Sequence, residues 1–180
     1  MATNAAEFSG HWQAQAPSVK TAKESDQDQV VAAVVLAFGS DPVARWVYPD
    51  PHQFLSSFPD IVRAFGGKAL EHGTAHYVDG FIGVALWLPP GVHPDEDRLI
   101  SVLQRTIAEG RREEVLGVLE QMGSFHPTEP HWYLPLIGVE PAHQGRGYGS
   151  ALLRYALENC DGNHEIAHLE SSNAKNIPLY

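Results

Sequence analysis

The sequence is poor in cysteine and in basic residues, and each shortage excludes a class of protein. Cys160 is the single cysteine among 180 residues, so a disulfide framework is excluded and we expect a reducing compartment, the cytoplasm. Only 12 Lys and Arg stand against 22 Asp and Glu, which gives a formal net charge of −10. Nucleic acids and anionic membranes both select a basic surface, so neither is an expected partner.

Long apolar runs and metal-binding spacings are also missing. No stretch approaches the roughly 18 residues of a membrane span, and residues 1–17, MATNAAEFSGHWQAQAP, lack the basic and apolar regions of a signal peptide. We expect residues 1–17 to be a flexible tail and residues 18–180 a single domain. Gly73 interrupts the pair His72/His76, and His164/His168 runs into a predicted strand, so no metal site is expected.

The residues that are present form patterns typical of a mixed α/β fold. Apolar periodicity predicts helices at 28–38, 61–70, 95–122 and 147–159, with the third divided at Gly110. Strands are predicted at 18–25, on both sides of a turn at Asp79-Gly80, at 131–139 and at 165–171, and a final helix begins near 173. Strand 131–139, helix 147–159 and strand 165–171 form a βαβ unit, which requires the two strands to be parallel. Pro135 predicts an edge or a bulge in strand 131–139.

The stretch PAHQGRGYGSALLRYAL, residues 141–157, places three glycines directly before a helix. The first amides of a helix have no internal acceptor and lie at the positive end of its dipole, so this arrangement is typical of an anion site. Without Cβ atoms at Gly145, Gly147 and Gly149, phosphate oxygens could approach the amides closely. Together with Arg146, they could hold a pyrophosphate on an acidic protein. A glycine turn that binds nothing is the alternative.

The residues of this turn distinguish between the known phosphate-binding signatures. The residues after Gly149 are Ser150 and Ala151, so the Lys-Ser/Thr of a Walker loop is missing, and the spacing of a dinucleotide fingerprint fails. QGRGYG, residues 144–149, instead matches the Q/R-x-x-G-x-G/A acetyl-CoA signature of the GNAT superfamily of N-acetyltransferases. The resemblance to puromycin N-acetyltransferase-like members is greatest in two stretches, HPTEPHWYLPLIGVEPAHQGRGYGSALL and HLESSNAKNIPLY. The resemblance implies the GNAT acyltransferase fold, a mixed sheet with parallel strands splayed around acetyl-CoA.

The resemblance also implies which residues contact the acetyl donor. They come from the splayed strand, the glycine turn and the last segment: Ile137, Gly138, Val139, Gln144, Gly145, Arg146, Gly147, Tyr148, Gly149, Ser150, Asn173 and Asn176. Backbone groups of the strand would bond the pantetheine amides, and either asparagine would contact the pantetheine arm. An ordinary helix cap is the alternative for both asparagines.

Direct attack of an amine on the thioester needs a base, an oxyanion donor and an acid for the sulfur. Tyr180 aligns with the tyrosine that protonates the thiolate in this family, although a packing role is the alternative. The N–H of Val139 could polarise the carbonyl. Glu170 is the candidate base, directly or through water, or else it binds the acceptor or the backbone; His131 is a weaker candidate for the base. Cys160 is interpreted as a packing residue.

The implied function is acetyl-CoA-dependent acetylation of a small-molecule primary amine. The acceptor would lie between segment 39–52, the helices at 95–122 and the splay, with Trp46 and Tyr48 as lining or core residues. Two alternatives are a CoA-binding or oligomerising domain without turnover, and a protein or peptide acetyltransferase. The family continues past the position of Tyr180 into E-R-x-G-F and two strands, so we interpret the domain as truncated at its C-terminal end, with a homodimer as the other way to cover strand 165–171.

Overall fold

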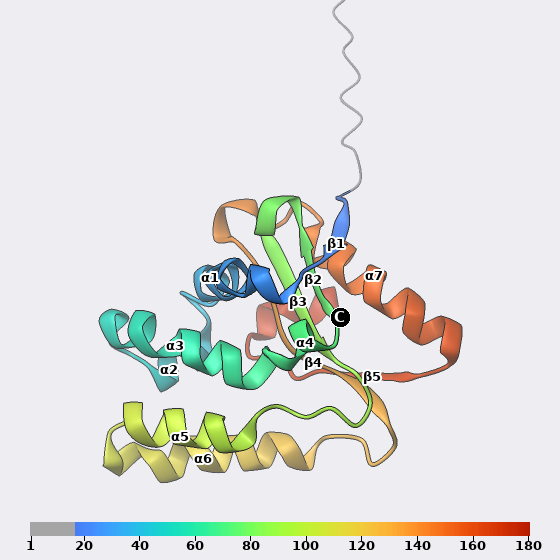
Figure 1. Cartoon of the computed structure of the whole chain (residues 1–180). Helices are drawn as coiled ribbons and strands as arrows, with labels where there is room; N and C mark the ends of the chain where they lie inside the picture. Colours follow the sequence, from blue (N-terminus) through green and yellow to red (C-terminus); the bar gives the residue numbers. More distant parts are fainter. Residues whose placement is uncertain (1–16) are drawn as a thin grey trace, which may run out of the picture.

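The core of the molecule is a five-stranded mixed sheet (Figure 1). The computed structural model describes residues 17–180. The strands β1 (Val19–Thr21), β2 (Ala75–Val78), β3 (Gly83–Leu88), β4 (His131–Val139) and β5 (Ile166–His168) lie in the sheet in chain order. All neighbours are antiparallel except β4 and β5, whose parallel pairing confirms the predicted βαβ unit. Apart from residue 17, the expected tail lies outside the described residues.

A bulge in β4 keeps both faces of the sheet apolar. Leu86 pairs with Leu136 and Leu88 with Tyr133, so two residues of β4, Leu134 and Pro135, oppose one residue of β3. Tyr133 and Leu136 consequently pack on the same face, although simple alternation would place them on opposite faces. The missing N–H of proline is tolerated at such a position, and this confirms the interpretation of Pro135 as a bulge residue.

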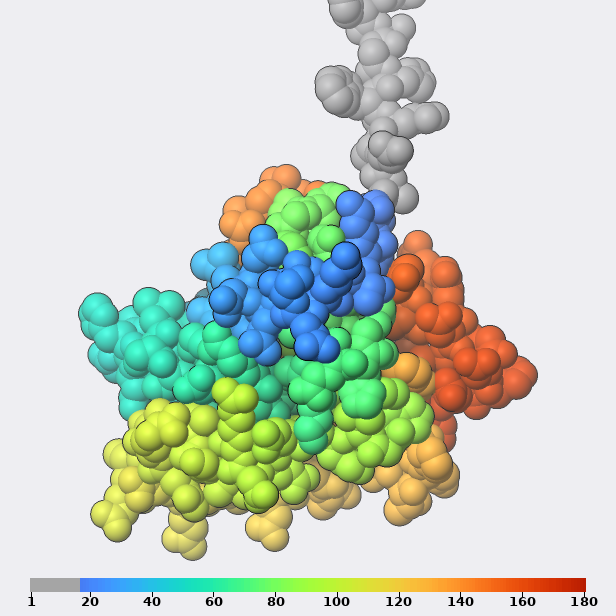
Figure 2. Space-filling model, viewed as in Figure 1, coloured from blue at the N-terminus to red at the C-terminus, as the bar shows by residue number. Residues whose placement is uncertain are grey.

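Helices cover both faces of this sheet and form a third layer. Their bounds are α1 (Gln27–Ala37), α2 (Pro42–Val47), α3 (Pro51–Gly66), α4 (Lys68–Glu71), α5 (Glu96–Thr106), α6 (Glu109–Ser124) and α7 (Tyr148–Asn163). α1 and α3 pack on one face of the sheet and α7 on the other, while α5 packs on α3 and α6 on α5. Figure 2 shows α5 along the lower edge of the molecule with parts of α6 beneath it. No helix within residues 17–180 has both the length and the apolarity to cross a membrane.

Several predicted boundaries are wrong, including the strand predicted at 18–25, which spans only Val19–Thr21, and the helix predicted at 147–159, which runs to Asn163. The helix predicted at 61–70 begins at Pro51, because the Asp50 side chain caps it at the amide of Gln53 and proline is favoured at the first helical position. The break between α5 and α6 lies at Ile107 and Ala108, and Gly110 is inside the first turn of α6. The strand predicted at 165–171 is paired only at 166–168, and a 3-10 helix, Ala174–Leu179, follows it.

The hairpin predicted around Asp79-Gly80 is present, with a longer turn than expected. Val78 pairs with Gly83. Between these two residues, Asp79, Gly80 and Phe81 all have positive φ angles. Of these three, glycine alone adopts such angles freely. The stacking of Phe81 on Tyr77, with ring centroids 4.0 Å apart, accompanies this unusual turn.

Candidate functional site

One cavity of about 750 Å³ joins the glycine turn to the helical layer of α2, α5 and α6. It is lined by β4, by the segment after β5 and by the 3-10 helix at 174–179. Apart from Arg146 and His131, every donor, acceptor or catalytic candidate named from the sequence lines it: Trp46, Tyr48, Ile137, Gly138, Val139, Gln144, Gly145, Gly147, Tyr148, Gly149, Ser150, Glu170, Asn173, Asn176 and Tyr180. The chain therefore brings together, in a single space, segments that are more than 130 residues apart.

The cavity opens where β4 and β5 separate. Their pairing ends at Tyr133 and His168, and beyond this point both Leu134–Val139 and Leu169–Asn173 line the cavity. The amide of Glu140 donates to the carbonyl of Ile82, 2.8 Å away, on the β3 side. Because successive N–H groups alternate between the two edges of a strand, the N–H of Val139 points to the other edge, into the splay. A backbone donor thus faces the cavity at the part of the β4 edge that β5 no longer pairs with.

The glycines of the turn serve two structural purposes, a positive φ angle and close packing. Gly145 and Gly147 have φ angles of 74° and 84°, and Gly147 immediately precedes α7. The missing Cβ of Gly149 makes room for Leu179, whose Cδ2 would lie 3.3 Å from it. The side chain of Gln144 donates to the carbonyl of Val139 at 3.0 Å, which ties the turn to the end of β4.

Tyr180 lies beside a carboxylate that sequence reasoning missed. Asp41 is buried in the cavity wall, where one carboxylate oxygen caps α2 at the amides of Val43 and Ala44, and the other accepts from the hydroxyl of Ser172 at 2.5 Å. Burial and the charge of Asp41 both raise the pKa of the Tyr180 phenol. The Asp41-Pro42 pair indicates a helix start in the sequence, but nothing local indicates its contact 131 residues away.

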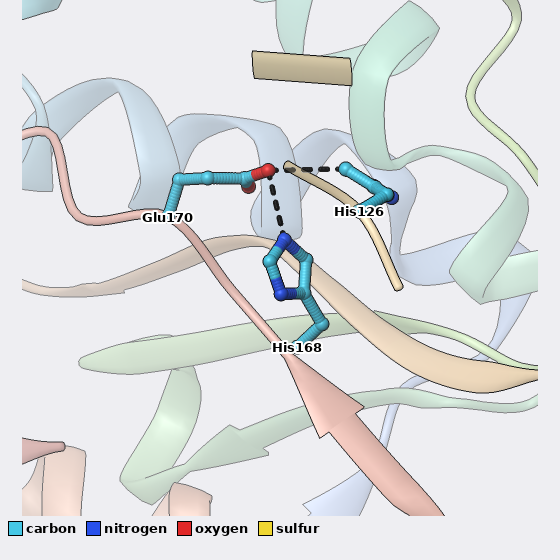
Figure 3. A group of neighbouring side chains, drawn as sticks. All are labelled: His126, His168 and Glu170. Carbon is cyan, nitrogen blue, oxygen red and sulfur yellow. Dashed lines mark hydrogen bonds and ion pairs between the residues drawn. The ribbon is translucent and has the colours of Figure 1, made fainter. Parts of the chain in front are cut away.

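Glu170 lies at the centre of a half-buried cluster of histidines (Figure 3). Nε2 of His126 and Nε2 of His168 both lie 3.0 Å from the same carboxylate oxygen of Glu170. Burial, the charge of Glu170 and a hydrogen bond to Glu170 all raise the pKa of Tyr133 beneath the cluster. One oxygen of Glu170 therefore contacts histidines from two segments, the loop after α6 and strand β5.

Two further contacts of histidine nitrogens extend this cluster. Nδ1 of His126 lies 3.2 Å from Nε2 of His131, and Nδ1 of His131 lies 2.9 Å from the carbonyl of Glu129. Burial lowers the pKa of His126, the charge of Glu170 opposes this effect, and His168 and His131 reinforce it.

His126, His168 and Glu170 could also hold a divalent metal, since their ligand atoms lie within 4.8 Å of one another. The sequence pairs His72/His76 and His164/His168 did not indicate this grouping. Spacing rules find histidines on one helix face, whereas these three residues come together from a loop and the end of a strand.

The far end of the cavity is aromatic and aliphatic. The ring of Trp46 lines it beneath the guanidinium of Arg111, whose central carbon lies 5.2 Å from the ring centroid. Tyr48 is fully buried and hydrogen-bonded to Thr106 at 2.7 Å, so it belongs to the core as well as to the wall. Apolar residues of α6 complete this end: Val115, Val118, Leu119 and Met122.

Two remaining candidates have clear structural roles. The Asn173 side chain accepts from the amide of Lys175 at 3.1 Å and so caps the last 3-10 helix, while still lining the cavity. Cys160 of α7 is buried, in agreement with a packing role.

The family and its relatives agree with this geometry. The model of the acetyltransferase (GNAT) family matches residues 68–180, which is more than half of the chain. An uncharacterized N-acetyltransferase of Schizosaccharomyces pombe is 27% identical over 177 residues, covering 91% of this chain and 72% of that protein.

Solved structures show the same fold. A Corynebacterium glutamicum protein named histone acetyltransferase HPA2 and related acetyltransferase is 26% identical, with a TM-score of 0.61 over 92% of this chain and 82% of that one. Arylalkylamine N-acetyltransferase 2 of Aedes aegypti is 14% identical, with a TM-score of 0.61 over 92% and 80% of the two chains.

Proposed function

The chain belongs to the GNAT family of acetyltransferases, and from this premise we propose that it transfers acetyl from acetyl-CoA to a small-molecule primary amine. The observation that carries the proposal is the single cavity of about 750 Å³ that runs from the glycine turn to an aromatic pocket. A cavity of this size suits a small ligand. Since the thioester end of the donor shares it, the space left for the acceptor is smaller still.

The donor would bind along the splay. The amides from Gln144 to Ser150 would hold the pyrophosphate at the start of α7, where positive φ angles turn the backbone. The free edge of Ile137 and Val139 would bond the pantetheine, and the side chains of Asn173 and Asn176, which line the same cavity, would border its arm.

The reacting groups would come from three sides of the thioester. The N–H of Val139 would polarise the thioester carbonyl, Glu170 would take the proton of the attacking amine, and Tyr180 would protonate the departing thiolate. The phenol of Tyr180, whose pKa is raised by burial and by the charge of Asp41, is protonated at neutral pH, as the proton donor in this role must be.

The cavity wall favours an amine with an apolar body. Trp46 and the α6 residues supply the apolar surface, and Asp41 and Glu170 place two carboxylates nearer the splay. A protonated amine would be attracted to these carboxylates while its body fills the aromatic end. This fits arylalkylamines, the class named for the Aedes aegypti protein, and the resemblance to puromycin N-acetyltransferases adds puromycin, a bulky aromatic primary amine.

Thiol release from acetyl-CoA tests the proposal, with phenethylamine, puromycin and a lysine-containing histone peptide as acceptors. We expect release with at least one of the two small amines. Tyr180→Phe should lower kcat about 10²-fold, within the usual range for acid–base groups, while acetyl-CoA affinity is kept. Tyr155→Phe, on α7 outside the cavity lining, is the matched control. Release with the peptide alone would contradict the small-molecule acceptor, and acetyl-CoA binding without any release would favour a binding domain.

A further inference from the structure

The cluster of His126, His168 and Glu170 has the composition of a zinc site. Two imidazole nitrogens and a carboxylate oxygen lie within 4.8 Å of one another, on half-buried side chains that are 23%, 17% and 19% exposed. Two histidines and a glutamate, with water as the fourth ligand, form the ligand set of several zinc enzymes. Magnesium and calcium prefer oxygen ligands, so the two imidazoles select a transition metal.

The spacing of the three ligand atoms suits a single ion. Nε2 of His126 and Nε2 of His168 each lie 3.0 Å from the same oxygen of Glu170, which the two rings approach from different directions (Figure 3). Ligands of a tetrahedral zinc ion, each at the usual distance from it, lie about 3.3 Å apart. A shift of a few tenths of an ångström in these side chains would therefore make room for the ion.

His131 orients His126 as the partners of metal-ligating histidines do. The carbonyl of Glu129 can only accept, so Nδ1 of His131, 2.9 Å away, carries a proton. Nε2 of neutral His131 then accepts from Nδ1 of His126 at 3.2 Å, which leaves the lone pair of His126 on Nε2, facing Glu170. Ligating histidines almost always donate from the other ring nitrogen in this way, and the partner fixes the direction of the ring.

An ion held by this cluster would affect the cavity through Glu170. Of the three ligands, Glu170 alone lines the cavity, whereas His126 and His168 stand behind it. A carboxylate that shares an oxygen with a dication is a much weaker base than a free one. With the ion bound, Glu170 would no longer take the proton of an attacking amine.

We propose that His126, His168 and Glu170 bind Zn²⁺, and that the bound ion inhibits acetyl transfer by occupying Glu170. The inhibition rests on the proposed function, in which Glu170 is the base, whereas the binding of zinc does not. The ion would have three protein ligands and one water, with His131 as the hydrogen-bond partner behind His126. The rate of acetyl transfer would then depend on the zinc available to the protein.

Calorimetric titration of the full chain, first freed of metal by a chelator, tests the binding without any acceptor. We expect one equivalent of Zn²⁺ to bind with micromolar or tighter affinity, and Mg²⁺ not to bind. His131→Ala should weaken zinc binding about 10- to 100-fold, the usual effect of losing such a partner, and His126→Ala or His168→Ala should weaken it further. His52→Ala, an exposed histidine of α3, is the matched control and should bind zinc as wild type does.

The ligands can also be identified in the wild-type chain, which avoids any effect of a substitution on folding. X-ray absorption at the zinc edge should show two imidazoles among the ligands of the bound ion. One imidazole, or more than two, would overturn the proposal. So would the absence of zinc binding by the wild-type chain, or wild-type affinity in a folded His126→Ala, which would place the ion on other residues.

Acetyl transfer tests the effect of the ion. The rate is followed by the loss of thioester absorbance, because zinc binds the free thiol of the product. With an acceptor from the thiol-release screen, one equivalent of zinc should lower the wild-type rate at least 10-fold and should leave the rate of His126→Ala unchanged. A wild-type rate that stays the same or rises with bound zinc would overturn the inhibition. Full activity of Glu170→Gln without zinc would instead show that the proposed role of Glu170 as base is wrong.

Discussion

Individual glycines set how closely the elements of this molecule approach one another. Gly138 of β4 lies against the last turn of α1, and a Cβ built on it would come 2.5 Å from the Cβ of Ala37. Gly117, in the middle of α6, has nothing within 4 Å of the same atom. The first glycine is thus required for packing, whereas the second only weakens its helix.

We predict opposite effects for the same substitution at these two sites. Gly138→Ala should lower the free energy of unfolding by about 1–3 kcal/mol, because α1 must move away from the sheet. Gly117→Ala should raise it by about 0.5–1 kcal/mol through helix propensity. Urea unfolding of both variants checks this. Equal stability of Gly138→Ala and wild type would show that α1 does not pack as described.

Single residues also show where sequence reasoning stops. Gly145 and Gly147 could be placed in a turn before a helix because glycine signals act locally, over a few residues. The contact between Asp41 and Ser172 and the contact between His126 and Glu170 join residues 131 and 44 positions apart. No short pattern encodes such pairs, because the fold alone determines that they meet.

At the scale of elements, the contact between β2 and α7 contains a buried histidine. His76 of β2 is 8% exposed and lies edge-on to Tyr155 of α7, with ring centroids 4.9 Å apart. Burial lowers its pKa from 6.5 to about 4. Between these pH values the unfolded chain binds a proton at His76 and the folded chain does not, so the folded state loses stability as the pH falls.

His76→Gln should therefore make stability less dependent on pH. From pH 7.5 to 4.5 we expect wild type to lose about 2–3 kcal/mol more free energy of unfolding than the variant, from the size of the pKa shift. Urea unfolding at the two pH values measures this, with the exposed His52→Gln as control. An equal loss in wild type and His76→Gln would mean that His76 is not buried in its neutral form.

Elements with strong local signals could be predicted from the sequence, and the others could not. Strand 131–139 has the predicted bounds because Pro130 and Pro141 limit a β-branched and aromatic run. The start of α3 was missed because Asp50-Pro51 serves equally well as a turn or as a helix cap, and Pro59 inside the helix interrupts its pattern. The break before α6 was misplaced because glycine is tolerated in a first helical turn, where it need not end a helix.

At the scale of the whole molecule, the proposed function depends on the splay of β4 from β5. The pairing of β4 with β5 stops at Tyr133 and leaves one strand edge open. The space beside this edge is enclosed by the glycine turn, by the last 3-10 helix and by the layer of α5 and α6. The groups proposed to bind the donor and the surface proposed to bind the acceptor therefore line one cavity. An acetyl donor held at the turn would present its thioester between Glu170 and Tyr180.

Calorimetric titration of acetyl-CoA into the wild-type chain, Gly147→Val and Gly162→Val tests this account most directly. Gly147 has a φ angle of 84° at the start of α7, which valine strains, whereas Gly162 lies at the other end of the same helix with open space around it. The account predicts a micromolar dissociation constant for wild type and Gly162→Val and at least tenfold weaker binding for Gly147→Val. Equal affinity for all three proteins, or no binding by the folded wild-type chain, would contradict it.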